Sequence, residues 1–382
     1  MAMWTVHLEG GPRRVNHAAI AIGEKVFSFG GYCTGEDYET RRPMDVHVLH
    51  TETLRWRLLP TPSDRQDVQN TPYQRYGHTA VAYEDSSYIW GGRNDTDGAC
   101  AVLFCFDTDS YTWHRPEVHG RPPGARDGHS ACVVARKMYI FGGYEEEVDR
   151  FSNEIFSLDL VSLSWCAIHP MGGKPPTWRD FHTSSPIGDL IYIFGGRSDQ
   201  GMEMFTNQEI YCNTMYTFNT NTWVWETVHV SEEEPTGRRS HSTFEYNGRL
   251  YVFGGYNGVV NRHFNDLHMF DPETKTWSLL KVRGEGPCPR RRQSCCLVGS
   301  KVFLFGGTSP SPNQDPDERA EHNLVDHSDL HILDMSPSLK TLCSLAVIKH
   351  KLDRSGLPCD LSWQLSILTT NNTITRPINN NG

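Results

Sequence analysis

The sequence lacks the features that mark secreted, membrane-spanning and metal-stapled proteins. Its 11 cysteines are an odd number and are scattered, with no C-x-x-C pair and no histidine at metal-ligand spacing. This excludes a disulfide framework and a zinc site and predicts reduced thiols. No basic-then-apolar signal opens the chain at Met1–Thr5. No apolar run approaches the about 18 residues that a membrane span needs. We therefore expect a cytosolic or nuclear protein with no membrane association.

Positive charge is also scarce. The chain has 36 Lys and Arg against 46 Asp and Glu, which gives a formal net charge of −10. A general nucleic-acid binder needs a basic surface to neutralise phosphates. The composition therefore argues against direct binding of nucleic acid.

What the sequence does contain is a repeat. Six times an apolar triplet runs into a Gly-Gly pair, and the successive pairs are 51 to 61 residues apart. A repeat of this length cannot bury its own apolar face, so the copies must pack on one another. The first glycines of the pairs are Gly30, Gly91, Gly142, Gly195, Gly254 and Gly306.

Each copy of the repeat predicts four short strands. A small-residue strand comes first, and the apolar strand that ends in Gly-Gly follows it. An alternating strand opened by Asp or Asn is next, and the last strand starts at a Trp. Four antiparallel strands in about fifty residues are typical of a propeller blade. The last strands start at Trp56, Trp113, Trp165, Trp223 or Trp225, and Trp277.

The sixth copy lacks such a Trp strand of its own. The segment Trp4–Leu8, which precedes the first copy, stands where a last strand should be. A strand from the N-terminus would close the ring and remove its open edges. We therefore predict an all-β fold, a six-bladed β-propeller over residues 1–335 closed by the N-terminal strand.

An Arg-x-x-His segment opens each copy, with Gln293 replacing His in the sixth. In a four-stranded antiparallel blade this segment and the residue after Gly-Gly emerge at the same end of the ring, which we call the mouth. A position filled in every blade is expected to serve the repeat itself. We therefore assign a structural role to the repeat arginines, Arg14, Arg75, Arg126, Arg179, Arg238 and Arg290.

Residues of the mouth that differ between blades are the better candidates for binding, because loops on a rigid scaffold carry most binding sites. Arginine presents a planar fork suited to carboxylate or phosphate. Acidic and aromatic neighbours would meet basic or apolar ligand groups. The candidates are Arg93, Arg197, Arg239, Arg292, Asp127, Asp180, Tyr144, Trp178 and Tyr256.

The pattern changes to a helical one at Ser336. Ser336-Pro337 predicts a capped helix start, and an apolar stripe follows at Leu339, Leu342, Cys343, Ala346 and Val347. A second short helix is predicted after Pro358, with Leu361, Leu365 and Leu368 on one side. We assign both helices to residues 336–368 and a flexible polar tail to residues 369–382. Amphipathic helices usually face a core, so both helices could simply pack on the propeller.

Two motifs in this region resemble known docking elements. Ser338-Leu339-x-x-x-Cys343-x-x-x-Val347 resembles the elongin-binding box of ubiquitin-ligase substrate receptors. Leu357-Pro358-x-x-Leu361-x-x-x-Leu365 resembles the cullin-2 box that follows it in those receptors. The six repeats resemble the kelch repeat. The whole chain is thus similar to the kelch-domain substrate receptors of cullin-2 RING ubiquitin ligases.

The resemblance implies the partners of the C-terminal helices. Elongin C, in complex with elongin B, would bind Leu339, Leu342, Cys343 and Val347. Cullin-2 with its RING subunit would bind Leu357, Pro358, Leu361 and Leu365. The protein would then be a non-catalytic adaptor without a cofactor or metal, and its role would be to bring substrates to the ligase for ubiquitination and degradation.

The resemblance also implies what the mouth binds: a C-terminal degron, a peptide that ends in Gly, with its free carboxylate gripped by arginine. A gripping Arg of the family follows the fourth Gly pair, and Arg197 matches it. A second family Arg has no counterpart in Ser198–Tyr211. A family Ser stands where this chain has Arg239, with Ser240 one residue later.

A basic residue near the terminal Gly of the degron is expected to meet Asp127, Asp180 or the run 145–147. The chain itself ends in Gly382, which predicts self-association through a neighbouring mouth.

Two other functions remain open. Plant kelch specifier proteins hold iron with E-x-x-x-D-x-x-x-H, but here Glu145 and Asp149 lead to Asn153, so the histidine ligand is missing. The other alternative is a plain kelch scaffold that binds cytoskeletal or chromatin partners, with helices that only cap the ring.

Overall fold

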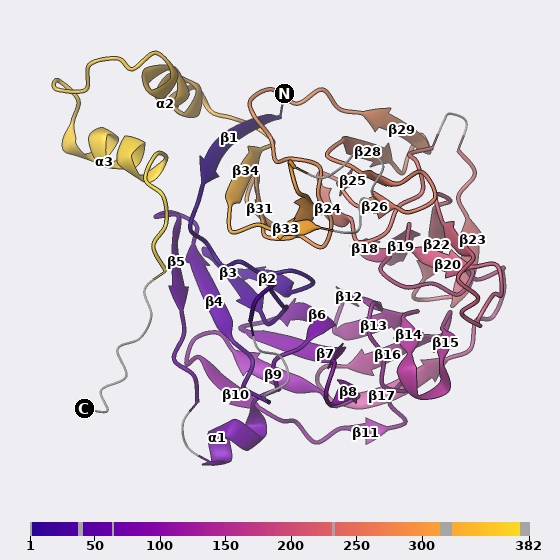
Figure 1. Ribbon diagram of the computed structural model, residues 1–382. Helices are drawn as coiled ribbons and strands as arrows, with labels where there is room; N and C mark the ends of the chain where they lie inside the picture. The colour runs from indigo at the N-terminus through magenta and orange to yellow at the C-terminus, as the bar shows by residue number, and fades with distance from the viewer. Residues whose placement is uncertain (1, 37–40, 63–64, 231–233, 314–322, 375–382) are drawn as a thin grey trace.

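Six sheets of mainly antiparallel strands stand around a central axis, and two helices project beside the ring (Figure 1). The computed structural model describes residues 2–36, 41–62, 65–230, 234–313 and 323–374. It confirms the six-bladed, all-β propeller. Gly382 and the self-association predicted for it lie outside the described residues.

Each of the first three blades has four main strands that are consecutive in the chain. Blade 1 consists of β2 (Ala18–Ile22), β3 (Lys25–Phe29), β4 (Val46–His50) and β5 (Arg55–Leu58). Blade 2 consists of β6 (Tyr76–Tyr83), β7 (Ser86–Asn94), β9 (Phe104–Asp107) and β10 (Thr112–His114). Blade 3 consists of β12 (Ser130–Val134), β13 (Lys137–Phe141), β16 (Ile155–Asp159) and β17 (Ser164–Ile168).

Blades 4 and 5 repeat this order, and blade 6 takes its outermost strand from the N-terminus. Blade 4 consists of β18 (Thr183–Ile187), β19 (Leu190–Phe194), β22 (Tyr216–Asn219) and β23 (Val224–Thr227). Blade 5 consists of β24 (Ser242–Tyr246), β25 (Arg249–Phe253), β28 (Leu267–Asp271) and β29 (Thr276–Leu279). Blade 6 consists of β30 (Ser294–Val298), β31 (Lys301–Phe305), β34 (Leu330–Asp334) and β1 (Met3–Leu8).

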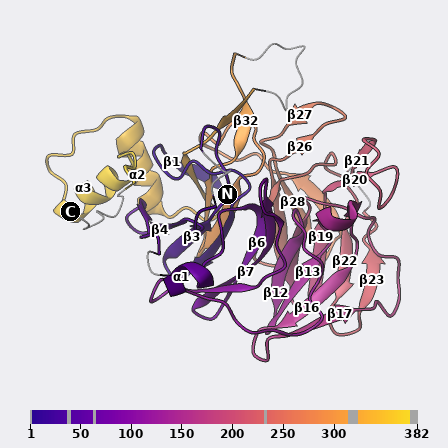
Figure 2. The same cartoon turned by 60° about the horizontal axis from the view of Figure 1, so that its bottom comes forward.

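Short elements decorate the loops. Strands β20, β26 and β32 rise on one face of the ring, the mouth (Figure 2). The short hairpins are β14 (Tyr144–Glu145) with β15 (Arg150–Phe151), β20 (Arg197–Asp199) with β21 (Glu209–Tyr211), β26 (Tyr256–Asn257) with β27 (Arg262–His263), and β32 (Thr308–Pro310) with β33 (Leu324–Asp326). The remaining small elements are α1 (Arg65–Asn70), β8 (Gly98–Ala99), β11 (His119–Gly120) and the 3-10 turn η1 (Glu146–Val148).

A closed circle of backbone hydrogen bonds joins the blades at the axis. The residue before each His, or before Gln293, donates its N–H to the carbonyl of the matching residue in the preceding blade, at 2.7–3.2 Å. Asn16 donates to Arg292 and closes the circle. All six residues have φ between 49° and 67°. They are Asn16, Gly77, Gly128, Phe181, Ser240 and Arg292.

The Gly-Gly pairs form a second circle in the opposite sense. The second glycine of each pair donates its N–H to the carbonyl of the repeat arginine in the next blade, at 2.8–2.9 Å. A Cβ on Gly92 would come within 2.6–2.8 Å of His78 and of the Tyr76 carbonyl, and its φ is 77°. Only glycine avoids both the clash and the strain at this point.

Tryptophan packs each blade onto the one before it. The Trp of each last strand contacts the aromatic residue that precedes the Gly pair of the preceding blade, with ring centroids 4.9–5.9 Å apart. Trp4 makes this contact with Phe253, which confirms that the N-terminal strand completes blade 6. Of the two candidates in blade 4, Trp225 takes this place and is 1% exposed.

The C-terminal helices are α2 (Leu339–Lys349) and α3 (Cys359–Ile367), as predicted. The predicted cap was wrong by two residues: Ser338, not Ser336, accepts the Thr341 N–H at 3.1 Å. None of the described helices is long and apolar enough to cross a bilayer.

The first residues after α3 are bonded to the propeller, whereas the sequence predicted a flexible tail over residues 369–382, of which 375–382 lie outside the described residues. Asn372 donates its N–H to the Glu9 carbonyl at 2.7 Å, and its side chain accepts the Trp56 N–H at 3.1 Å. The Asn371 side chain accepts the Glu9 N–H at 3.0 Å. Asn371 and Asn372 thus form hydrogen bonds with backbone groups of Glu9, just after β1, and of Trp56 in β5. These bonds hold the end of the helical segment against the propeller.

Closure by β1 leads to a first prediction. Leu8 is 1% exposed and packs in the core between blades 6 and 1. We expect Leu8→Ala to lower the free energy of unfolding by about 2–5 kcal/mol, because a core cavity replaces the side chain. Thermal and urea denaturation measure this, with Leu279→Ala, 62% exposed in β29, as the matched control. Equal effects of the two variants would contradict the closure by β1.

Candidate functional site

The mouth is built from the same two positions in every blade. The residue after each repeat arginine pairs as a short antiparallel bridge with the residue after the Gly pair. The sequence had predicted that both lie at this end of the ring, but not that they pair. The six pairs are Val15–Tyr32, Tyr76–Arg93, Asp127–Tyr144, Asp180–Arg197, Arg239–Tyr256 and Arg291–Thr308.

The repeat arginines themselves are structural, as predicted. All six are at most 8% exposed. In blades 2 to 6 the side chain donates to the carbonyl of the first glycine of its own blade, at 2.9–3.3 Å. In blade 1, Arg14 instead pairs with Asp45 and Glu36. In each blade the guanidinium thus holds the loop in place.

The repeat histidines are also structural. Burial lowers the pKa of His78 and His241 to about 3, so they stay neutral at physiological pH. His129 bonds Thr79 at 2.8 Å and His241 bonds Thr183 at 3.0 Å, each across a blade interface. They act as neutral spacers around the axis.

Five of the candidate residues come together in a cavity of about 220 Å³ between blades 2, 3 and 4. Phe181 and Phe205 complete its wall, and the sequence reasoning had missed both. We call this cavity the acidic pocket. The five candidates are Arg93, Asp127, Tyr144, Asp180 and Arg197.

Arg197 is held firmly in the acidic pocket. It pairs with Asp180 at 2.5 Å and with Glu209 at 3.1 Å. Its guanidinium carbon lies 5.5 Å from the Phe151 ring centroid and 5.7 Å from that of Phe205. The pKa of Arg197 is raised, because these two carboxylates outweigh the cost of burial. Its charge is therefore largely neutralised within the chain.

Asp127 is the unusual acid of this pocket. Burial and the nearby Asp180 raise its pKa to about 7, against the opposing effects of Arg93 and Arg197. The side chain is 7% exposed. Arg93 pairs with Glu146 at 2.9 Å and so does not neutralise Asp127 by a direct ion pair. Asp127 can thus change its protonation state near neutral pH, and a basic partner would favour its ionised form.

The opposite side of the mouth is basic. We call Arg239, Arg291 and Arg292, from blades 5 and 6, the basic cluster. Burial first, and then the charges of these three arginines, lower the pKa of His263 to about 3. Arg239 Nε donates to the Tyr211 hydroxyl at 3.3 Å, and Arg292 Nη1 donates to that of Tyr32 at 2.6 Å.

Ser240 and Arg292 also line a small cavity of about 120 Å³ at the axis, to which every blade contributes. Arg291 was not among the sequence candidates. Its place directly after a repeat arginine, which it shares with Arg239 and Asp180, was the signal that could have found it.

Three of the candidates are not positioned to contact a ligand directly. Tyr256 is 1% exposed and lies under the guanidinium groups of Arg239 and Arg291, so it supports the basic cluster. Asp180 is also 1% exposed, and its carboxylate is occupied by Arg197. Trp178 is half-buried and lines neither mouth cavity.

The docking candidates on α2 are accessible, whereas one on α3 is not. Leu339 is 77% exposed and Leu342 is 43% exposed, and Cys343 is exposed as well. Val347, Leu357 and Leu361 are half-buried, and Pro358 is exposed. Leu365 is only 3% exposed. The structure thus places Leu365 inside the protein, where it supports the helix and does not reach a partner.

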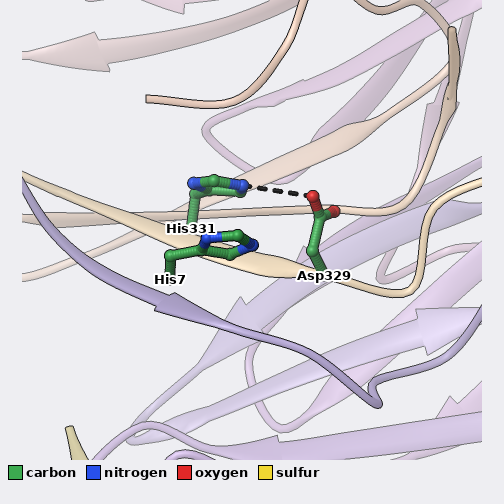
Figure 3. Close-up of side chains that lie close together, drawn as sticks. All are labelled: His7, Asp329 and His331. Carbon is green, nitrogen blue, oxygen red and sulfur yellow. Dashed lines mark hydrogen bonds and ion pairs between the residues drawn. The ribbon is translucent and has the colours of Figure 1, made fainter. Parts of the chain in front are cut away.

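A further cluster, of His7, Asp329 and His331, has ligand atoms within 4.8 Å of one another (Figure 3). Its contacts link neighbouring parts of blade 6 to one another. Arg290 occupies both oxygens of Asp329, at 2.6 and 2.7 Å, and the His7 ring stacks on His331 at 4.3 Å. A metal ion would have to displace a buried arginine, so this cluster does not fit a metal centre.

Comparisons with known proteins agree with this architecture. A family model described as the KLHDC2/KLHL20/DRC7 Kelch-repeats domain matches residues 77–307. The chain is 55% identical over 380 residues to Kelch domain-containing protein 3 of Homo sapiens and of Bos taurus, and the alignment covers 99% of both chains in each case. Host cell factor of Drosophila melanogaster is 25% identical over 81% of this chain, which is 21% of that protein.

Sequence segments had indicated the resemblance to Kelch domain-containing protein 3, which the full-length identity confirms. These segments are 93–95, 126–129 and 326–333.

The raised pKa of Asp127 leads to a second prediction. Between about pH 4 and pH 7 the folded protein keeps a proton on Asp127 that the unfolded chain has lost, so stability falls as the pH rises. We expect Asp127→Asn to raise the free energy of unfolding by about 2–4 kcal/mol at pH 8 and by close to nothing at pH 4. Urea denaturation at both pH values tests this, with Asp109→Asn in an exposed turn as control. An equal effect at both pH values would refute the assignment.

Proposed function

Because the chain belongs to the kelch-repeat family that includes Kelch domain-containing protein 3, we propose that its mouth binds the C-terminus of partner proteins as the substrate receptor of a cullin-2 ubiquitin ligase. The observation that carries the proposal is the division of charge across the mouth. The basic cluster occupies one side, and a buried, titratable acid occupies the other.

The basic cluster suits a terminal carboxylate. Arg239 and Arg291 are at most 5% exposed and Arg292 is half-buried, so a carboxylate near them would be largely shielded from water. Charge-assisted hydrogen bonds are strongest in such a setting. The axial cavity next to Arg292 and Ser240 holds only about 120 Å³, which favours a last residue without a side chain, namely glycine.

The acidic pocket suits a basic side chain upstream of that glycine. Asp127 is about half protonated at pH 7 and largely protonated below it, and an arginine or lysine of the peptide would favour its ionised form. The aromatic rings of Tyr144 and Phe205 line the same cavity and would pack on the aliphatic part of such a side chain.

The exposed face of α2 suits a groove on a partner. Leu339, Leu342 and Cys343 are accessible on a helix that stands away from the mouth (Figure 2). Helices recognised in grooves present such apolar anchors at spacings of three and four residues. We assign this face to elongin C with elongin B, and the start of α3, around Leu357, Pro358 and Leu361, to cullin-2 with its RING subunit. The proposed complex would act in the cytosol or the nucleus.

The alternative is a kelch scaffold whose helices only cap the ring. The anchoring of Asn372 and the burial of Leu365 favour it, because both tie the helical segment to the chain itself. The exposure of Leu339 opposes it. The role of the helices and the role of the mouth must therefore be tested separately.

For the mouth, we expect a peptide that ends in Arg-Gly to bind in a fluorescence-polarisation assay. Amidation of its C-terminus and the variant Arg239→Ala should each weaken binding roughly 10- to 100-fold, because each removes a charge-assisted hydrogen bond. Arg249→Ala, in which an exposed arginine paired with Asp271 is lost, is the matched control and should bind as the parent does. Equal affinity for the acid and the amide would rule out the proposed degron site.

The same assay addresses the terminus of the chain itself, since Gly382 could occupy a neighbouring mouth. One residue added after Gly382 should raise the affinity for the peptide and lower the oligomeric state in solution. If both stay unchanged, self-association through Gly382 is excluded.

For the helices, we expect the double variant Leu339→Ala, Cys343→Ala to lose co-purification with elongins and cullin-2 from cells. Its affinity for the peptide should remain that of the parent, since the mouth is unchanged. Leu352→Ala, 52% exposed just after α2, is the control and should keep both partners. An unaltered set of partners in the double variant would favour the scaffold.

A further inference from the structure

The largest of the cavities that we identified lies away from the two mouth cavities, on the flank between blades 1 and 2. Its volume is about 660 Å³. Four arginines line it, and none of the described lining residues carries a carboxylate. We call it the arginine cavity. In a chain with a formal net charge of −10 this concentration of positive charge is unexpected. The four arginines are Arg41, Arg42, Arg75 and Arg115.

Arg75 is the repeat arginine of blade 2, and it lacks a partner that its equivalents have. In blades 5 and 6 a carboxylate, Asp266 or Asp329, accepts hydrogen bonds from both terminal nitrogens of the arginine. Arg126 pairs with Glu145 and Glu154, and in blade 4 Arg179 Nη2 donates to the Thr177 hydroxyl at 3.0 Å.

By contrast, Arg75 Nη2 has no hydrogen-bond partner among the described residues, although the side chain is only 1% exposed. The sequence explains this difference, because the third strand of blade 2 is preceded by Val102 and Leu103, where blade 5 has Asp266. An unpartnered buried guanidinium nitrogen is costly, so the site favours an external anion.

The other three arginines add positive charge to the same cavity. Arg115 is exposed and makes no ion pair with any described residue. Arg41 is paired only loosely with Asp97, at 3.6 Å, and Arg42 pairs with Glu36 at 2.6 Å. The guanidinium groups of Arg41 and Arg75 lie 5.0 and 3.8 Å from the ring centroid of Tyr73, which keeps both near the cavity.

The rest of the wall is mixed: Gln69, Asn70 and Thr71 are polar, and another part of the wall is apolar. Pro43, Tyr73, Val102 and Phe104 line the cavity beside the arginines. A ligand that uses both the arginines and the apolar part of the wall combines an anionic group for the guanidinium forks with an apolar body. An inorganic anion would leave the apolar part of the wall without contacts.

We propose that the arginine cavity is a second binding site, which takes a carboxylate attached to an apolar group. Such a group occurs in an acidic segment of a partner polypeptide and in small organic acids. The site is separate from the mouth, because the two share no lining residue, and it stands whether or not the mouth binds degrons.

The test uses the full chain and two probes. The first is the peptide acetyl-Glu-Phe-Glu-Leu-amide, whose blocked end offers no terminal carboxylate to the mouth. The second is phenylacetate, a small acid of the same chemistry. Isothermal titration calorimetry measures both against the parent and the double variant Arg41→Gln, Arg115→Gln. These two side chains are exposed, so the variant is expected to fold, and circular dichroism checks this.

We expect at least one probe to bind the parent and to bind the double variant at least tenfold more weakly, because two charged donors are lost. The control, Arg136→Gln with Arg249→Gln, replaces two exposed arginines outside the cavity and should change nothing. An excess of a Gly-ended peptide should not displace the probe.

Binding of the peptide alone would identify a polypeptide segment as the natural source of the carboxylate. Binding of phenylacetate alone would identify a small acid, and binding of both would leave the site open to either source. The proposal is overturned if neither probe binds, if the double variant binds as the parent does, or if a Gly-ended peptide displaces the probe. The last result would place the probe in the mouth.

Discussion

The structure depends on the closed circle of backbone hydrogen bonds at the propeller axis. Each blade donates one N–H to the blade before it and, through its second glycine, one to the blade after it. Both circles require unusual backbone: the residue before each His, or before Gln293, is left-handed in all six blades, and the second glycines lie too close to the first strand of their own blade for a Cβ. Because these bonds satisfy groups that would otherwise be buried without partners, the mouth above them is held in one geometry.

On this frame the blades differ in only a few positions, and those differences create the chemistry. The residue after the repeat arginine is Asp127 and Asp180 in blades 3 and 4, but Arg239 and Arg291 in blades 5 and 6. Identical backbone positions therefore place acids on one side of the axis and bases on the other. The loss of a carboxylate partner acts in a similar way at Arg75, where the repeat continues but its counter-charge is missing. Departures from the repeat mark both proposed sites.

Sequence periodicity predicted the fold in detail, because every copy imposes the same local conditions. The spacing of the Gly-Gly pairs placed all six blades, and the missing Trp strand placed Trp4 in blade 6. The structural role of the repeat arginines also followed from repetition alone. The same reasoning failed for Tyr256 and Leu365, which are buried, and for the segment around Asn372, which is anchored. These errors share a cause: the burial of one side chain depends on neighbours far away in the chain, and no local pattern encodes them.

The sequence alone determined four features: the number of blades, the closing strand, the helical extension and the end of the ring that carries the variable residues. Each follows from local periodicity and from the antiparallel order of the strands within a blade. The packing of the blades decided the rest. It brought Asp127 next to Asp180 and raised its pKa, paired Arg197 with Asp180 and Glu209, and left Arg75 without a carboxylate beside a large cavity. Electrostatic energy depends on distance and burial, and both arise only when residues from different blades meet.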